Sequence, residues 1–142
     1  MRISWLLALA VLLAPPARAD DIRLTAGPGC NAAVSPCRLT GGGLEIRFRM
    51  PGGAPAMRPF PVVVEVSGPA AAELGKLEAE FVMPDMDMGQ NRYRLVKQDD
   101  GHWVAEVILP ACSMGRHDWL ARLVLEGAGR RWLAEIPFQE TR

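Results

Sequence analysis

The chain has 142 residues, of which 49% are hydrophobic, and its 16 Lys and Arg residues balance 16 Asp and Glu residues. This length suits one domain with a single core, and the balanced charge argues against a nucleic-acid-binding protein, which needs a basic surplus or stripe. No apolar run reaches the roughly 18 residues of a membrane span, and three cysteines are too few for a disulfide-scaffold miniprotein.

The N-terminus has the pattern of a secretory signal peptide. A positive start at Met1-Arg2 precedes an apolar run over 3–14, and Ala17-Arg18-Ala19 supplies the small-x-small pattern that signal peptidase reads. We therefore expect residues 1–19 to be removed and Asp20 to begin the mature chain, with an uncleaved membrane anchor as the alternative. The mature protein is then exported, and the periplasm is its expected compartment.

The cysteines must be interpreted for that oxidising compartment, where one disulfide and one unpaired thiol are expected. Cys30 and Cys37 are close together in a segment rich in Gly, Pro and Asn that is able to turn back on itself. They are the first candidates for pairing, and a bridge to Cys112 is the rival. The remaining thiol is either a buried apolar side chain or a soft metal ligand.

The mature chain is dominated by alternation of apolar and polar residues with a period of two, which predicts β-strands. The predicted strands cover 44–50, 60–67, 76–83, 91–97, 102–109, 118–126 and 131–138. Turn signals separate them, and those at 97–101 and 127–129 are typical of hairpins. Seven or eight short strands without a long helix predict an all-β fold, an antiparallel β-sandwich that is immunoglobulin-like in general shape. Its body spans 44–142, after an N-terminal strand and Cys30/Cys37 flap over 20–43.

A methionine cluster is the most distinctive chemical feature of the sequence. Met83, Met86 and Met88 fall within Met83-Pro84-Asp85-Met86-Asp87-Met88-Gly89, where Pro84 favours the end of a strand. Placing Met86 and Met88 between carboxylates in a surface loop is a poor way to fill a core. Thioether sulfur is a soft ligand suited to Cu(I), and Met-x-Met spacing on an extended segment directs both side chains to one face. Met83 continues the inward face of its strand, so a role in the core alone is an alternative for it.

A second group of donors follows the strand 102–109. Cys112, Met114 and His117 are clustered there, whereas His102 opens the same strand at its other end. The predicted strands 76–83 and 102–109 end at Met83 and Leu109. If these two ends lie at the same end of the sandwich, the methionine loop and this second loop lie there together. Two of these residues also have interpretations without a metal. Cys112 is equally well explained as a buried or disulfide-bonded thiol, and an isolated histidine such as His117 is usually a surface residue.

Several of these elements together resemble the YtkA-like domain, which is related to the FixH group. They are the methionine run 83–89, the strand-like run from Asp100 to Val107, the Leu109-Pro110 exit and the stretch from Gly115-Arg116 through Trp119. The resemblance covers roughly residues 60–138. It implies an exported immunoglobulin-like sandwich with a link to copper handling or cytochrome oxidase assembly, in which Met83, Met86 and Met88 match the motif methionines. The chain departs from this family in three ways. FixH-type proteins keep an N-terminal membrane anchor, whereas the signal peptide of this chain is expected to be removed. The Cys30/Cys37 flap lies outside the matched pattern, and Cys112 occupies a position where the pattern has no cysteine.

The leading hypothesis is a non-enzymatic periplasmic copper-binding accessory protein. Met86 and Met88 bind Cu(I), and Met114, Cys112 or His117 complete an exposed site that exchanges the ion with a copper-donating or copper-accepting envelope protein. The alternative is a metal-free envelope module whose methionine loop forms an adaptable contact patch. An enzyme is disfavoured, since the sequence has no metalloprotease motif, nucleophile elbow or phosphate-binding loop.

Overall fold

The computed structural model describes residues 21–142, so the expected signal peptide at 1–19 lies outside the described residues. The described chain is all-β, as predicted: it contains eleven strands, and its one helical element is the short 3-10 turn η1 (Ala71–Glu73). The described part contains no helix with the length and apolar character needed to cross a membrane.

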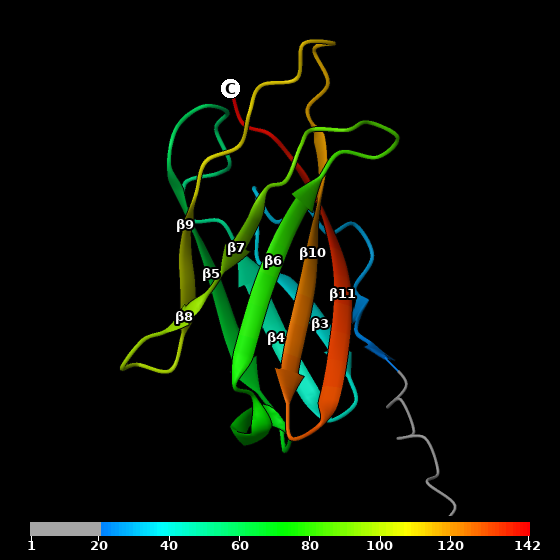
Figure 1. Cartoon of the computed structure of the whole chain (residues 1–142), viewed down its shortest axis with the longest axis vertical. Helices are drawn as coiled ribbons and strands as arrows, with labels where there is room; N and C mark the ends of the chain where they lie inside the picture. Colours follow the sequence, from blue (N-terminus) through cyan, green and yellow to red (C-terminus); the bar gives the residue numbers. More distant parts are fainter. Residues whose placement is uncertain (1–20) are drawn as a thin grey trace, which may run out of the picture.

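The strands form two sheets that face each other as two layers (Figure 1). Sheet A has the order β1-β11-β10-β6-β7, and sheet B the order β2-β3-β4-β5-β9-β8. The strands are β1 (Ile22–Arg23), β2 (Thr25–Ala26), β3 (Cys37–Gly41), β4 (Leu44–Arg49), β5 (Phe60–Ser67), β6 (Lys76–Val82), β7 (Arg92–Arg94), β8 (Val96–Lys97), β9 (Trp103–Val107), β10 (Asp118–Gly127) and β11 (Arg130–Gln139). Every neighbouring pair is antiparallel except β1 and β11, which run parallel.

The core lies between the two layers and follows the period-two pattern of the sequence. The inward residues of β6, Leu77, Ala79 and Phe81, are fully buried, and those of β4 and β10 behave in the same way. Because a buried large apolar side chain contributes about 1.5–3 kcal/mol, these alternating positions hold the sheets together. Within sheet A, Phe81 of β6 contacts the ring of Phe138 of β11 edge-on, with ring centroids 6.0 Å apart.

Residues 91–97 do not form the single strand that the sequence predicts. The segment splits into β7, which pairs with β6 in sheet A, and β8, which pairs with β9 in sheet B. Leu95 between them is buried, and its N–H donates to the carbonyl of Leu77. The side chain of Leu95 reaches the core, so the chain crosses there from one layer to the other. Both predicted hairpins are present, as the β8–β9 and β10–β11 turns.

Candidate metal centre

Two loops that carry the predicted ligands lie at the same end of the molecule. Val82, the last residue of β6, is opposite Leu120 in the adjacent antiparallel β10. The segment 83–91 therefore leaves sheet A where the segment 108–117 enters it, at the upper end of Figure 1. We call them the Met loop (83–91) and the Cys loop (108–117). The strand directions thus bring the two predicted groups of donors to one edge, as expected.

The Met loop begins with a turn instead of the extended segment that the sequence predicts. The N–H of Met86 donates to the carbonyl of Met83 over 3.2 Å, and Asp85 adopts a left-handed conformation with φ of 59°. The exposure of successive side chains nevertheless alternates along the loop. Asp85 and Asp87 are exposed, whereas Met86 and Met88 are half-buried and pack against the core. Met83 is only 2% exposed. The loop thus holds two thioethers between the core and the surface.

A direct contact between sulfur atoms joins the two loops. The Cys112 thiol lies 3.2 Å from the Met86 thioether, Sγ to Sδ, although the residues are 26 positions apart in the sequence. A thiol is a weak donor and a thioether a weak acceptor, so this contact is a weak hydrogen bond. Cys112 is half-buried like Met86. We call Cys112 and Met86 the sulfur pair.

Arg116 ties the loops together around this contact. Its Nη1 donates to the Pro84 carbonyl over 2.8 Å, and its Nε and Nη2 donate to the Asp118 carboxylate over 3.0 and 2.6 Å. The hydrogen bonds that Arg116 donates to Asp118 raise the pKa of Arg116 above its usual range, and the nearby Cys112 and Asp85 groups add to the effect. The same bonds lower the pKa of Asp118 below its ordinary value of 3.8. A permanent cation therefore lies beside the sulfur pair.

His117 is held by an acidic side chain from the C-terminal end of the chain. Its Nδ1 lies 3.1 Å from Oε1 of Glu140, whose Oε2 accepts a 3.3 Å hydrogen bond from the indole of Trp119. The Glu140 side chain is only 8% exposed. Because a carboxylate can only accept, this contact places a proton on Nδ1, and the tautomer with that proton leaves Nε2 as the nitrogen that could bind a metal. The arrangement resembles the carboxylate–histidine pairs that orient metal ligands.

The remaining candidates are placed differently. Met114 belongs to the Cys loop, but it is 75% exposed, and it lies in the turn in which Gly115 N–H donates to the carbonyl of Cys112. His102 lies at the other end of β9, where its Nε2 is 3.7 Å from Glu65 of β5. The structure therefore brings together Met86 and Cys112, keeps Met83 and Met88 in the same loop, and leaves Met114 at the surface.

Cys30 and Cys37 form a disulfide, and Cys112 is a half-buried free cysteine. The rival bridge to Cys112 is thus not formed, and that thiol stays available. Within residues 21–142 no group of three or more His, Cys, Asp and Glu side chains is arranged to hold a metal ion.

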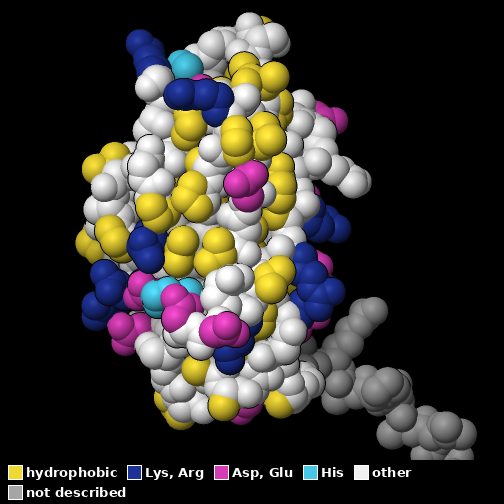
Figure 2. Space-filling view, turned by 90° about the vertical axis from the view of Figure 1, so that its left-hand side faces the viewer, with side chains coloured by type: hydrophobic (Ala, Val, Ile, Leu, Met, Phe, Trp, Pro, Cys, Tyr) yellow, Lys and Arg dark blue, Asp and Glu magenta, His cyan; other side chains and the backbone are white. Residues whose placement is uncertain are grey.

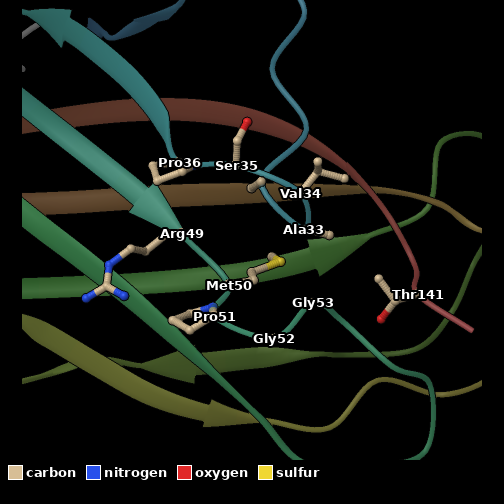
Figure 3. Close-up of a pocket in the computed structure, with 11 residues that line it drawn as sticks. Ala33, Val34, Ser35, Pro36, Arg49, Met50, Pro51, Gly52, Gly53 and Thr141 are labelled. Atoms are coloured by element: carbon tan, nitrogen blue, oxygen red, sulfur yellow. The ribbon is translucent and has the colours of Figure 1, made fainter.

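A separate pocket of about 430 Å³ opens beside the disulfide flap (Figure 3). Its lining comes from the flap, the end of β4 with the following turn, and the C-terminal segment: Ala32, Ala33, Val34, Ser35, Pro36, Arg49, Met50, Pro51, Gly52, Gly53 and Thr141. Arg49 is the one charged residue of the lining, and its guanidinium lies 3.6 Å from Glu65. Neither residue of the sulfur pair lines the pocket, so the pocket is not part of the candidate metal centre.

Sequence reasoning missed Arg116 and Glu140 as parts of this site. Arg116 enters the resemblance only as part of a Gly-Arg step, although its position two residues before Asp118 is a local charge signal. Glu140 gives no such signal, because it lies 23 positions from His117 and meets it only through the pairing of β10 with β11.

Comparisons with protein-family models, with curated proteins and with solved structures find no match for this chain. A functional assignment therefore rests on the arrangement of the chain's own residues.

Proposed function

We propose that this chain is an exported, non-enzymatic accessory protein that binds Cu(I) through sulfur and exchanges it with another envelope protein. The observation that carries the proposal is the 3.2 Å contact between Cys112 and Met86. Two soft donors from separate loops converge at a half-buried position, and thiolate and thioether sulfur are the ligands that select Cu(I). Copper delivery, including delivery for cytochrome oxidase assembly, and copper tolerance are the roles such a protein serves.

The surrounding residues fit a sulfur site. Met88 and Met83 supply further thioethers from the same loop, one half-buried and one buried. His117 supplies an imidazole whose Nε2 is left as the acceptor by the contact with Glu140. Arg116 holds the Met loop through the Pro84 carbonyl, which keeps the sulfur pair in register without using a ligand atom. The half-buried position limits access of water and still permits release of the ion.

The proposed family is the YtkA-like and FixH-related one, with an immunoglobulin-like sandwich. Two facing sheets with mostly antiparallel pairing support this proposal, as does the methionine run 83–89 at the end of β6. A periplasmic location is supported by the disulfide between Cys30 and Cys37, because disulfides persist in oxidising compartments. The signal-peptide pattern in the sequence points the same way.

A metal-free envelope module is the second candidate. It is favoured by the exposure of Met114, which is 75% exposed in the Cys loop. Flexible thioethers suit adaptable protein contacts, so the same loops would then serve as a contact patch.

Anaerobic Cu(I) titration of the mature protein separates the two candidates. Under the copper proposal the wild-type protein binds Cu(I), and both Met86→Leu and Cys112→Ser weaken binding by more than about tenfold, since even second-shell partners of metal ligands reach that effect. Met86→Leu conserves volume, so the fold is kept. Met57→Leu is the matched control, because Met57 is an exposed methionine outside both loops.

The expected order of effects is specific. Met114→Leu changes the affinity less than Met86→Leu, because Met114 is exposed and Met86 contacts the thiol. A wild-type protein that binds no Cu(I), or variants of the sulfur pair that bind as tightly as the Met57→Leu control, would contradict the copper proposal and favour the metal-free module.

A further inference from the structure

The methionines within residues 21–142 differ in their exposure to water. Two are buried, two are half-buried and two are exposed: Met50 and Met83, Met86 and Met88, and Met57 and Met114, in that order. Of the exposed two, Met57 lies outside both loops, whereas Met114 belongs to the Cys loop. Figure 2 shows apolar side chains at the surface up to the end of the molecule where that loop lies. Met114 is therefore an exposed soft donor on a loop that carries the sulfur pair.

A short turn keeps Met114 close to Cys112. The N–H of Gly115 donates to the carbonyl of Cys112 over 3.1 Å, so residues 112–115 form a four-residue turn with Met114 at its third position. Residues two positions apart have Cα atoms at most about 7 Å apart, and the Cα atoms of disulfide-bonded cysteines are up to about 6.8 Å apart. An ion between two sulfur atoms spans more than a direct S–S bond, so one ion can contact Cys112 and Met114 together.

The turn is fixed at both ends, but the side chain of Met114 is not. At one end Cys112 contacts Met86, and just beyond the other end Arg116 donates to the Pro84 carbonyl. Met114 is 75% exposed and is not among the residues that pack against the core. Because a methionine side chain is unbranched and rotates about three bonds, the thioether is free to turn toward the sulfur pair or toward water while the backbone stays in place.

This arrangement bears on the rate at which an ion leaves the sulfur pair. Cys112 and Met86 are half-buried, so an ion between them is partly shielded from the donor atoms of an incoming protein. The hydrogen bond from Arg116 to Pro84 also resists separation of the two loops. An exposed thioether on the same loop offers the ion a ligand that an incoming donor reaches without movement of the loops.

We propose that Met114 is a transfer ligand, which binds Cu(I) only while the ion enters or leaves the sulfur pair. The inference rests on the proposed function and adds to it the path of exchange. During release, a bond forms between Met114 Sδ and Cu(I) as the bond to Met86 Sδ breaks. A sulfur or nitrogen donor of the acceptor then binds the ion, the bonds to Cys112 and Met114 break, and the Cys112 thiolate takes a proton from water. Copper stays Cu(I) throughout, and loading follows the same steps in reverse.

Stopped-flow measurement of copper transfer tests this role. For release, the Cu(I)-loaded mature protein is mixed without oxygen with the chelator bathocuproine disulfonate, whose Cu(I) complex is coloured. For loading, the protein is mixed with the acetonitrile complex of Cu(I), and the ultraviolet absorbance of the thiolate–Cu(I) bond is followed. In Met114→Leu both rates fall by about tenfold, which corresponds to about 1.4 kcal/mol in the barrier. The dissociation constant, as the ratio of the two rates, stays within about twofold of the wild-type value.

Two further variants separate the sulfur atom from the other properties of the side chain. Met114→Ala is as slow as Met114→Leu, because both lack the thioether, although alanine leaves more space for the chelator. Met57→Leu, at the exposed methionine outside both loops, keeps the wild-type rates. All three variants keep an unfolding free energy close to that of the wild-type chain, because both positions are exposed.

Failure of this inference is distinguishable from failure of the proposed function. Wild-type rates in Met114→Leu, or faster transfer in Met114→Ala, overturn the transfer role, while weaker binding in Met86→Leu still supports the copper site. A Met114→Leu variant that loses affinity as strongly as Met86→Leu makes Met114 a permanent ligand and also overturns the transfer role. A wild-type protein that binds no Cu(I) contradicts the proposed function and this inference with it.

Discussion

Sulfur atoms meet at two places in this molecule, and the two places are built differently. In the flap, Cys30 and Cys37 are bonded covalently seven positions apart. At the end of β6, Cys112 meets Met86, which lies 26 positions away and has a thioether that cannot form a disulfide. The first pair is sealed by oxidation, whereas the second keeps a free thiol in contact with another soft atom.

The difference shows that one chain holds its cysteines in two ways, one bonded covalently and one free. The flap uses the covalent bond to close a short loop, and its Asn31 side chain accepts hydrogen bonds from the backbone of Ala33 and of Gln139 in β11. The two loops that carry the sulfur pair are joined instead by a non-covalent contact, the hydrogen bond from Arg116 to the Pro84 carbonyl. Covalent closure therefore serves stability at the flap, and non-covalent closure leaves the thiol available at the other site.

Removing the disulfide is expected to have the largest effect on stability. The double variant Cys30→Ser/Cys37→Ser should lose about 2–3 kcal/mol of unfolding free energy, the loop-entropy value for so short a closed loop. Urea unfolding followed by circular dichroism measures the loss. The Cu(I) affinity of the folded variant should be unchanged, because neither cysteine belongs to the sulfur pair.

Cys112→Ser is the matched control for that measurement, and it should change the unfolding free energy much less. Equal losses in the two variants would show that the covalent pair and the sulfur pair do not differ in their contribution to stability.

Removing the Glu140 carboxylate should have an intermediate effect. Glu140→Ala leaves the Trp119 indole N–H and the His117 ring without their acceptor, and a buried polar group without a partner costs about 1–3 kcal/mol. Urea unfolding measures this loss too, and the nitrogen-15 NMR shifts of His117 report the change of its tautomer. Glu135→Ala, which removes an exposed carboxylate of β11, should cost less. An equal cost in both variants would argue against a positioning role for Glu140.

Breaking the Arg116 contacts should act mainly on the accessibility of the thiol. In Arg116→Gln the Met loop loses the hydrogen bond at Pro84, so Cys112 should react faster with a thiol reagent in the folded protein. Arg122→Gln, on the same strand as Asp118 and paired with Glu135, is the control and should leave the rate unchanged. A rate that is equal in the two variants would mean that Arg116 does not hold the loops together.

The smallest expected effect is a pH dependence from the Arg116–Asp118 pair. The pKa of Asp118 lies below 3.8 in the folded protein, so its contribution to stability is fully present above pH 3.8 and is lost as the pH falls through the lowered pKa. The difference in unfolding free energy between the wild-type chain and Asp118→Asn should therefore shrink below pH 3.8. A difference that stays constant into more acidic solution would contradict this assignment.

Much of the fold could be predicted because strand periodicity is a local property. The alternation in 44–50, 76–83 and 118–126 reappears as β4, β6 and β10 with their apolar residues inward. The segment 91–97 is predicted less well, because the burial of Leu95 between two sheets depends on where the second sheet lies. For the candidate site, the sequence identifies Met86 and Cys112 as possible ligands, but it does not predict that they contact each other.

The sequence by itself determined which residues alternate, where the chain turns, and which soft donors follow the strands, since each of these is decided by neighbours a few positions away. Only the tertiary structure decided that Met86 touches Cys112, that Arg116 bonds the Pro84 carbonyl, and that Glu140 holds His117. These contacts join residues 23 to 32 positions apart. They exist because β10 pairs with β6 on one side and with β11 on the other. This strand order is determined by the packing of the whole core, and no local sequence pattern encodes it.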